Sequence, residues 1–117
     1  MSAMKSFIIA ALIVALGATG GTTTVTVAPS NISFKAALAA CSAGTLGAIA
    51  IALGHVRIAE GSGINSDIDD ANPNAQSIML SGGGGSATAI VNASKHTVSA
   101  KNVALVSSRR VACVGKD

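Results

Sequence analysis

Two cysteines and two histidines carry most of the reactive chemistry that this sequence offers. Cys41 and Cys113 are the cysteines, and a thiol beside His55 or His96 would make a nucleophile–base pair. No HExxH, CxxC or G-x-S-x-G motif accompanies them. We therefore predict no enzymatic activity, no catalytic residue and no cofactor.

The two cysteines have two interpretations that their spacing leaves open. In an exported chain, Cys41 and Cys113 can form a disulfide that closes a loop of about 70 residues. Such a bond would stabilise the fold by roughly 4 kcal/mol in the chain-entropy model. The alternative is a pair of buried free thiols.

The acidic residues gather in one short segment. Asp67, Asp69 and Asp70 could supply oxygen ligands to Ca²⁺. An EF-hand loop, however, needs glycine where Asn72 stands and glutamate where Ile78 stands. We interpret the segment as a solvated loop and predict no metal site.

A run of glycines follows over residues 81–86. With Ala87 it gives the pattern G-x-G-x-x-A, but no acidic residue follows at the distance that ribose binding requires. The composition is typical of a flexible joint, so we predict a Gly-rich hinge there.

The N-terminal segment has the pattern of a secretory signal. Lys5 precedes the apolar run 7–16, and small residues follow at 17–21. Ala15 and Gly17 suit cleavage before Ala18. We expect residues 1–17 to be a signal peptide or, if uncleaved, a membrane anchor.

Residues 34–56 favour an Ala-rich helix, with Ser33 as its N-cap. Small residues recur every fourth position and would let a second helix approach closely. They define a predicted helix-packing face, which favours homo-oligomers: Ala36, Ala40, Gly44, Ala48 and Ala52. Because residues 36–53 carry no charge, a membrane span is the alternative.

The segments on either side of this helix favour strands. The β-branched run 22–27 predicts one strand before it. After the glycines, we expect short antiparallel hairpins, built from the apolar runs 87–91, 97–100, 103–106 and 111–114. The same tail holds a predicted basic surface that could contact an anionic surface or lipid: Lys95, Lys101, Arg109, Arg110 and Lys116.

Composition limits the function classes. Half of the residues are hydrophobic, 11% are charged and two are aromatic. These values argue against disorder and against the aromatic platforms that bind single-stranded nucleic acids, so we expect no specific nucleic acid partner.

Together these patterns predict an α+β fold with an N-terminal apolar helix. Its segments would be a signal peptide or anchor (1–17), a strand with the Ala-rich helix and polar loop (18–80), the glycine linker (81–86) and a basic hairpin tail (87–117). We expect a small exported, non-enzymatic structural or binding subunit in the periplasm, outside the cell or on its surface. The alternative is an integral membrane protein, a two-helix hairpin with a basic cytoplasmic tail.

Overall fold

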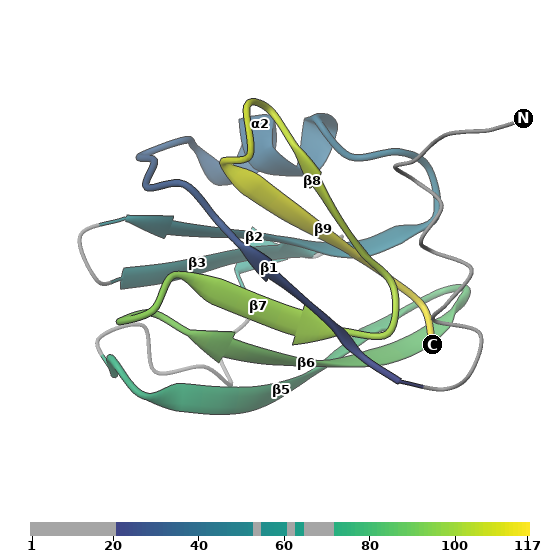
Figure 1. Cartoon of the computed structure of the whole chain (residues 1–117). Helices are drawn as coiled ribbons and strands as arrows, with labels where there is room; N and C mark the ends of the chain where they lie inside the picture. Colours follow the sequence, from purple (N-terminus) through teal and green to yellow (C-terminus); the bar gives the residue numbers. More distant parts are fainter. Residues whose placement is uncertain (1–20, 53–54, 61–62, 65–71) are drawn as a thin grey trace, which may run out of the picture.

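Two antiparallel β-sheets face each other in the computed structural model, which describes residues 21–52, 55–60, 63–64 and 72–117 (Figure 1). The four-stranded sheet has the order β1 (Thr23–Thr26), β7 (Thr97–Ala100), β6 (Gly85–Asn92) and β5 (Ala75–Gly82). The five-stranded sheet has the order β4 (Gly63–Ile64), β3 (His55–Glu60), β2 (Thr45–Ala52), β9 (Val111–Gly115) and β8 (Val103–Val106). A six-residue helix, α2 (Phe34–Ala39), lies against β2 and β3. The predicted N-terminal helix or signal falls outside the described residues.

The predicted α+β fold with one helix over 34–56 is wrong. The helix ends at Ala39, and a turn with Gly44 at φ +93° leads into β2. Within β2, alanine and isoleucine alternate from Ala48 to Ala52, which is the period of a strand. Every residue from Leu46 to Ala52 is buried, so the strand lacks the polar positions that would have revealed its period.

This correction also removes the basis for the membrane hairpin. Eight of the residues assigned to the predicted span form β2 instead. In the described part of the chain, no helix is long and apolar enough to cross a membrane.

The predicted glycine hinge is also wrong. Gly82 pairs with Gly85, and Gly83 and Gly84 form the two-residue turn of the β5–β6 hairpin. The pairing continues without interruption from there to Ala75 and Asn92. The glycines therefore join two strands of one sheet.

The C-terminal strands do not form a separate tail. β6 and β7 belong to the four-stranded sheet, whereas β8 and β9 belong to the five-stranded sheet. β1 pairs with β7, and β2 pairs with β9. Segments 18–80 and 87–117 thus contribute strands to both sheets.

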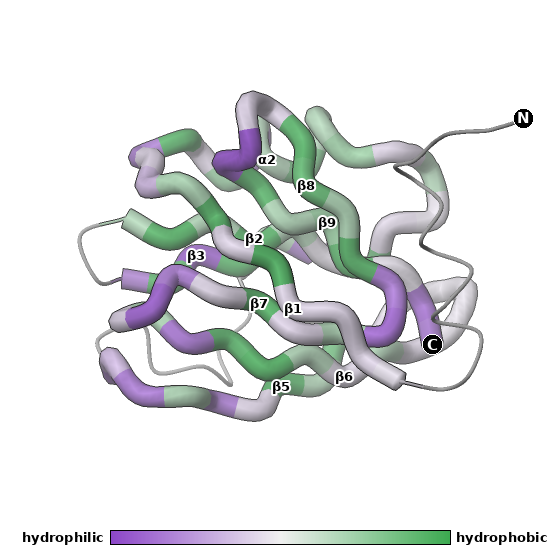
Figure 2. Tube along the Cα trace, in the orientation of Figure 1, coloured by the Kyte–Doolittle hydropathy of each residue, from purple (hydrophilic) through white to green (hydrophobic). Residues whose placement is uncertain are grey.

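The main core lies between the sheets. Hydrophobic residues recur along the strands of both sheets (Figure 2). The largest fully buried side chains of this core come from these strands and from the residue that follows β1: Val27, Ile49, Ile51, Ile58, Leu80, Val91, Val98 and Val114. Burying a side chain of this kind contributes about 1.5–3 kcal/mol. A second, smaller core lies on the other side of the five-stranded sheet, where α2 covers Ala48, Ala59 and Val111.

Candidate binding surface

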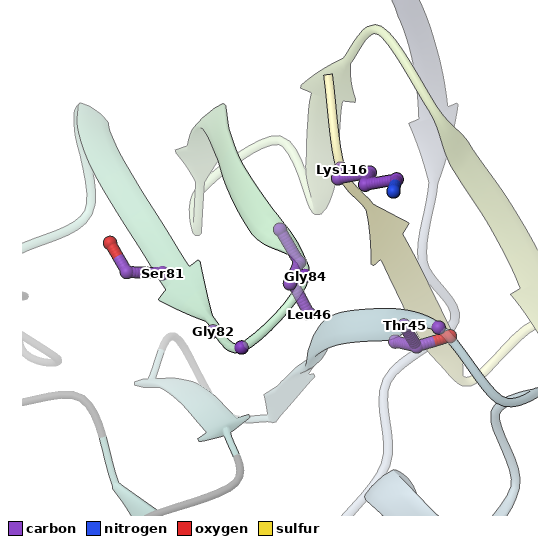
Figure 3. Close-up of a pocket in the computed structure, with 8 residues that line it drawn as sticks. Thr45, Leu46, Ser81, Gly82, Gly84 and Lys116 are labelled. Carbon is purple, nitrogen blue, oxygen red and sulfur yellow. The ribbon is translucent and has the colours of Figure 1, made fainter.

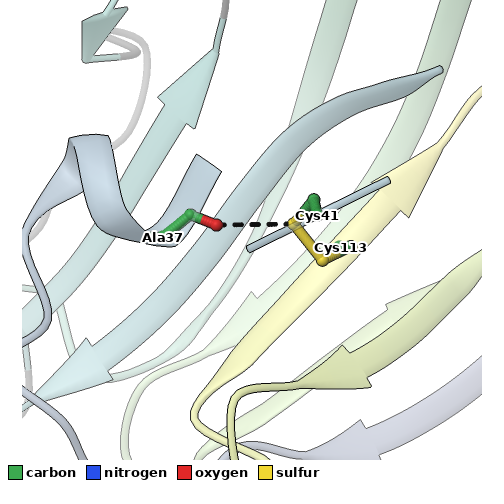
Figure 4. The surroundings of a disulfide bond; sticks show 3 residues. All are labelled: Ala37, Cys41 and Cys113. Carbon is green, nitrogen blue, oxygen red and sulfur yellow. Dashed lines mark hydrogen bonds between the residues drawn. A yellow bond between two sulfur atoms is a disulfide. The ribbon is translucent and has the colours of Figure 1, made fainter. Parts of the chain in front are cut away.

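A disulfide joins Cys41 to Cys113, which confirms that interpretation of the two cysteines (Figure 4). Cys41 follows α2 and Cys113 lies on β9, with 5.8 Å between their Cα atoms. The Cys41 sulfur lies 3.5 Å from the carbonyl oxygen of Ala37. The bond therefore fastens α2 over the outer face of the five-stranded sheet. While it is intact, neither cysteine has a thiolate for nucleophilic chemistry.

The two histidines belong to different sheets. His55 begins β3 and is exposed, whereas His96 lies in the β6–β7 turn at φ 55°. The His96 carbonyl oxygen accepts a 2.7 Å hydrogen bond from the Val27 N–H. Its Nδ1 is buried and has no hydrogen-bond partner among the described residues. His96 thus helps to attach the segment after β1, and neither histidine is on the strand that carries Cys113.

The predicted helix-packing face is not a single surface. Ala36 is in α2, Ala40 caps it and Gly44 is in the following turn. Ala48 and Ala52 lie on β2, and both are buried within the chain. The five residues therefore cannot dock a second helix as a group. The acidic residues at 67–70 lie outside the described residues. In the ranges described, no three His, Cys, Asp or Glu side chains are grouped as a metal site.

The predicted basic surface is divided between the two ends of β8 and β9. Lys95 is in the β6–β7 turn, and Arg109 and Arg110 are in the β8–β9 turn. Hydrogen bonds of 2.7 Å, from Val27 N–H to His96 and from Ala28 N–H to Arg109, bring these two turns to one end. Lys101 and Lys116 are at the opposite end, where the Asn102 side chain donates to the Lys116 carbonyl oxygen. All five side chains are exposed. An anionic surface would therefore meet only part of this set at one time.

A pocket of about 460 Å³ lies beside the glycine turn (Figure 3). Residues from the β5–β6 hairpin and the start of β2 line it, together with one cation: Gly44, Thr45, Leu46, Ser81, Gly82, Gly83, Gly84 and Lys116. A Cβ on Gly82 would lie 3.0 Å from Leu46 Cδ2, so that glycine lets the hairpin approach β2. The glycines are followed by a strand, so they lack the helix N-terminus that a dinucleotide site uses.

The outer face of the four-stranded sheet is a further candidate binding surface. Its strands contain no charged residue, and its side chains are mostly hydroxyl-bearing. We call this surface the open face; its members are Thr24, Thr26, Ser77, Met79, Ser81, Thr88, Ile90, Thr97 and Ser99. Thr24 Oγ1 and Ser99 Oγ share a 2.6 Å hydrogen bond across two of the strands.

Two large hydrophobic side chains lie next to each other on the open face. Met79 is 58% exposed and Ile90 is 46% exposed. Met79 is paired with Thr88, and Ile90 with Ser77, so the two hydrophobic residues are diagonal neighbours on β5 and β6. Sequence reasoning missed this surface because it took the glycines at 81–86 for a flexible joint and not for the turn that pairs β5 with β6. Residues 76–81 do not alternate between polar and apolar types, because Met79 is apolar on the exposed face, so no local sequence pattern marks β5 as half-buried.

No protein-family model, curated protein or solved structure matches this chain.

Proposed function

We propose that this protein is a small exported structural or binding subunit, without enzymatic activity, that associates with other copies of itself through the open face. One observation carries the proposal. Met79 and Ile90 are exposed side by side on an uncharged sheet face, whereas the outer face of the other sheet is covered by α2. Exposed apolar groups on an uncharged surface favour association with another protein surface.

Export to the periplasm, the exterior or the cell surface is supported by two independent features. The sequence over 5–17 has the order of a basic, an apolar and a small-residue region. The Cys41–Cys113 bond is of the kind that persists in oxidising compartments. Small domains in such compartments are commonly stabilised by disulfides in addition to their hydrophobic cores.

The test is the molar mass of the purified, disulfide-bonded chain across a range of concentrations, measured by sedimentation or by light scattering after size exclusion. We expect the mass to rise with concentration. The double variant Met79→Ser/Ile90→Thr should weaken association about tenfold or more, because it removes apolar area from the contact surface.

Ala104→Ser is the matched control, since Ala104 is an exposed strand residue on the other sheet. It should associate like the native chain. A native chain that stays at the mass of one chain at every concentration would rule out self-association. Equal weakening by the control would mean that the open face is not the contact surface.

A further inference from the structure

β5 lies at one end of the four-stranded sheet, where β6 pairs with one of its two edges. Its register with β6 runs from Ala75 and Asn92 to Gly82 and Gly85. Within the ranges that the structure describes, no strand pairs with its other edge. β5 has eight residues, so at about 3.4 Å per residue this edge is roughly 27 Å long.

The backbone groups on that edge belong to alternate residues. The two-residue turn is closed by Gly82 and Gly85, which exchange hydrogen bonds as the first narrow pair of the hairpin. Because bonded pairs alternate along an antiparallel ladder, Leu80 and Ile78 also bond to β6. The N–H and C=O groups that point away from β6 are therefore those of Ala75, Ser77, Met79 and Ser81.

The residues of β5 themselves lack three features with which proteins prevent strands from pairing: charge, proline and a bulge. Residues 75–82 contain no charge and no proline, and their pairing with β6 has no bulge. The opposite edge of the same sheet is different. β1 has four residues, and the backbone after it is bonded to the other sheet through Ala28 N–H and the Arg109 carbonyl oxygen.

We propose that β5 pairs antiparallel with β5 of a second copy, about a two-fold axis that passes beside Ile78. This inference rests on the proposed self-association and specifies its geometry. The pairing joins the two four-stranded sheets into one continuous sheet. Ser77 then lies opposite Met79 of the second copy, and Ala75 lies opposite Ser81 of the second copy.

Self-complementarity favours a second copy as the occupant of this edge. About this axis, each outward-pointing residue of one β5 meets an outward-pointing residue of the other, whereas a shift of the axis to residue 77 or 79 leaves some of them unpaired. The two strands are uncharged, so no like charges meet across the axis. The axis also places the two Met79 side chains as diagonal neighbours, with Ile90 of each copy beside them.

Disulfide cross-linking tests the register. The single variants Ser77→Cys and Met79→Cys are purified separately, each with its native disulfide intact, and mixed in a mild thiol–disulfide redox buffer. We expect a cross-linked heterodimer in the mixture, at least fivefold more than the cross-linked product of either variant alone. The matched control is Ser77→Cys mixed with Thr26→Cys, which is on the open face at the other edge and should not cross-link.

Each other outcome has a defined meaning. Equal cross-linking of Met79→Cys with itself overturns the axis at Ile78. Absence of cross-linking in the mixture, while the native chain still associates, overturns the pairing of β5 and leaves the proposed self-association standing. A native chain that is monomeric throughout overturns both.

A second variant separates edge pairing from contact through the open face. Ser77→Pro removes an N–H that points away from β6 and keeps Met79 and Ile90 in place; proline is tolerated at such positions of edge strands. We expect association to weaken at least tenfold while the midpoint of urea unfolding, measured at high dilution, stays within about 0.5 M of the native value. Unchanged association would overturn the proposal.

Discussion

The outer faces of the two sheets differ in what covers them. In the five-stranded sheet, β2 is buried from Leu46 to Ala52 and β9 from Val111 to Val114, because α2 and the disulfide cover the face turned away from the main core. In the four-stranded sheet, β5 and β6 alternate between buried and exposed residues, since one face packs and the other is open. The first arrangement stabilises one chain, whereas none of the described residues covers the second face, to which we propose that another copy binds.

The largest effect is expected when the same charged residue is placed on the covered outer face of one sheet and on the open face of the other. Ala59 is on β3, on the face that α2 covers, and it is 2% exposed. Thr88 is exposed and is paired with Met79. Ala59→Lys should lower the free energy of unfolding by more than about 4 kcal/mol, because it inserts a large side chain and an unpaired charge into a packed site. Thr88→Lys should change it by no more than about 0.5 kcal/mol.

Urea unfolding of both variants, at concentrations low enough to keep the chain monomeric, measures the difference. Similar losses for the two variants would mean that the outer faces are equally packed, and the distinction between them would fail.

The second test removes the disulfide, which contacts only the outer face of the five-stranded sheet that α2 covers. Cys41 and Cys113 are separated by 72 positions, so Cys41→Ser/Cys113→Ser should lower the free energy of unfolding by about 4 kcal/mol in the chain-entropy model. The amide protons of α2 should then exchange before those of β6, because the bond holds the helix against β9. The native chain in reductant is the control for the substitutions themselves. A loss of protection that is uniform across both sheets would contradict this role.

The smallest expected effect concerns the start of the covering helix. Ser33 Oγ accepts a 3.2 Å hydrogen bond from the Ala36 N–H, which caps α2. Ser33→Ala should cost about 1 kcal/mol, and Ser33→Asp should retain most of the stability because aspartate also caps helices. Thermal unfolding of the three chains ranks them. If Ser33→Ala and Ser33→Asp change the stability equally, the Ser33 cap does not contribute measurably to holding α2 on the five-stranded sheet.

The sequence offered the disulfide as one of two interpretations, because two cysteines leave a single intramolecular pairing once export is inferred. The helix over 34–56 was predicted wrongly for a physical reason. A strand buried on both faces is a continuous apolar run, and such a run has no polar positions with which to tell a strand from a helix. Ala48 and Ala52, four positions apart, then matched the spacing of a small-residue helix face by coincidence.

The candidate surface was less accessible to sequence reasoning than the disulfide was. Alternation within Ala87–Asn92 marks Thr88 and Ile90 as residues of one exposed face. Placing Met79 beside Ile90, however, requires the β5–β6 register, and that depends on recognising the glycines as a turn. The division of the basic residues depends on contacts such as Ala28 with Arg109, which are far apart in sequence and leave no local pattern.

The pairing of the first strand with a late one also sets the order in which the protein can assemble. A chain leaves the ribosome or an export channel from its N-terminus, so β1 and β2 emerge well before β7 and β9, their partners. The four-stranded sheet cannot be completed until β7 has emerged, and the five-stranded sheet cannot be completed until β9 has emerged. Until then β1 and one edge of β2 remain unpaired. Sandwiches dominated by such distant contacts fold slowly. The interval between emergence and closure is therefore when this chain is most exposed to aggregation, and when a chaperone would have the greatest effect on its yield.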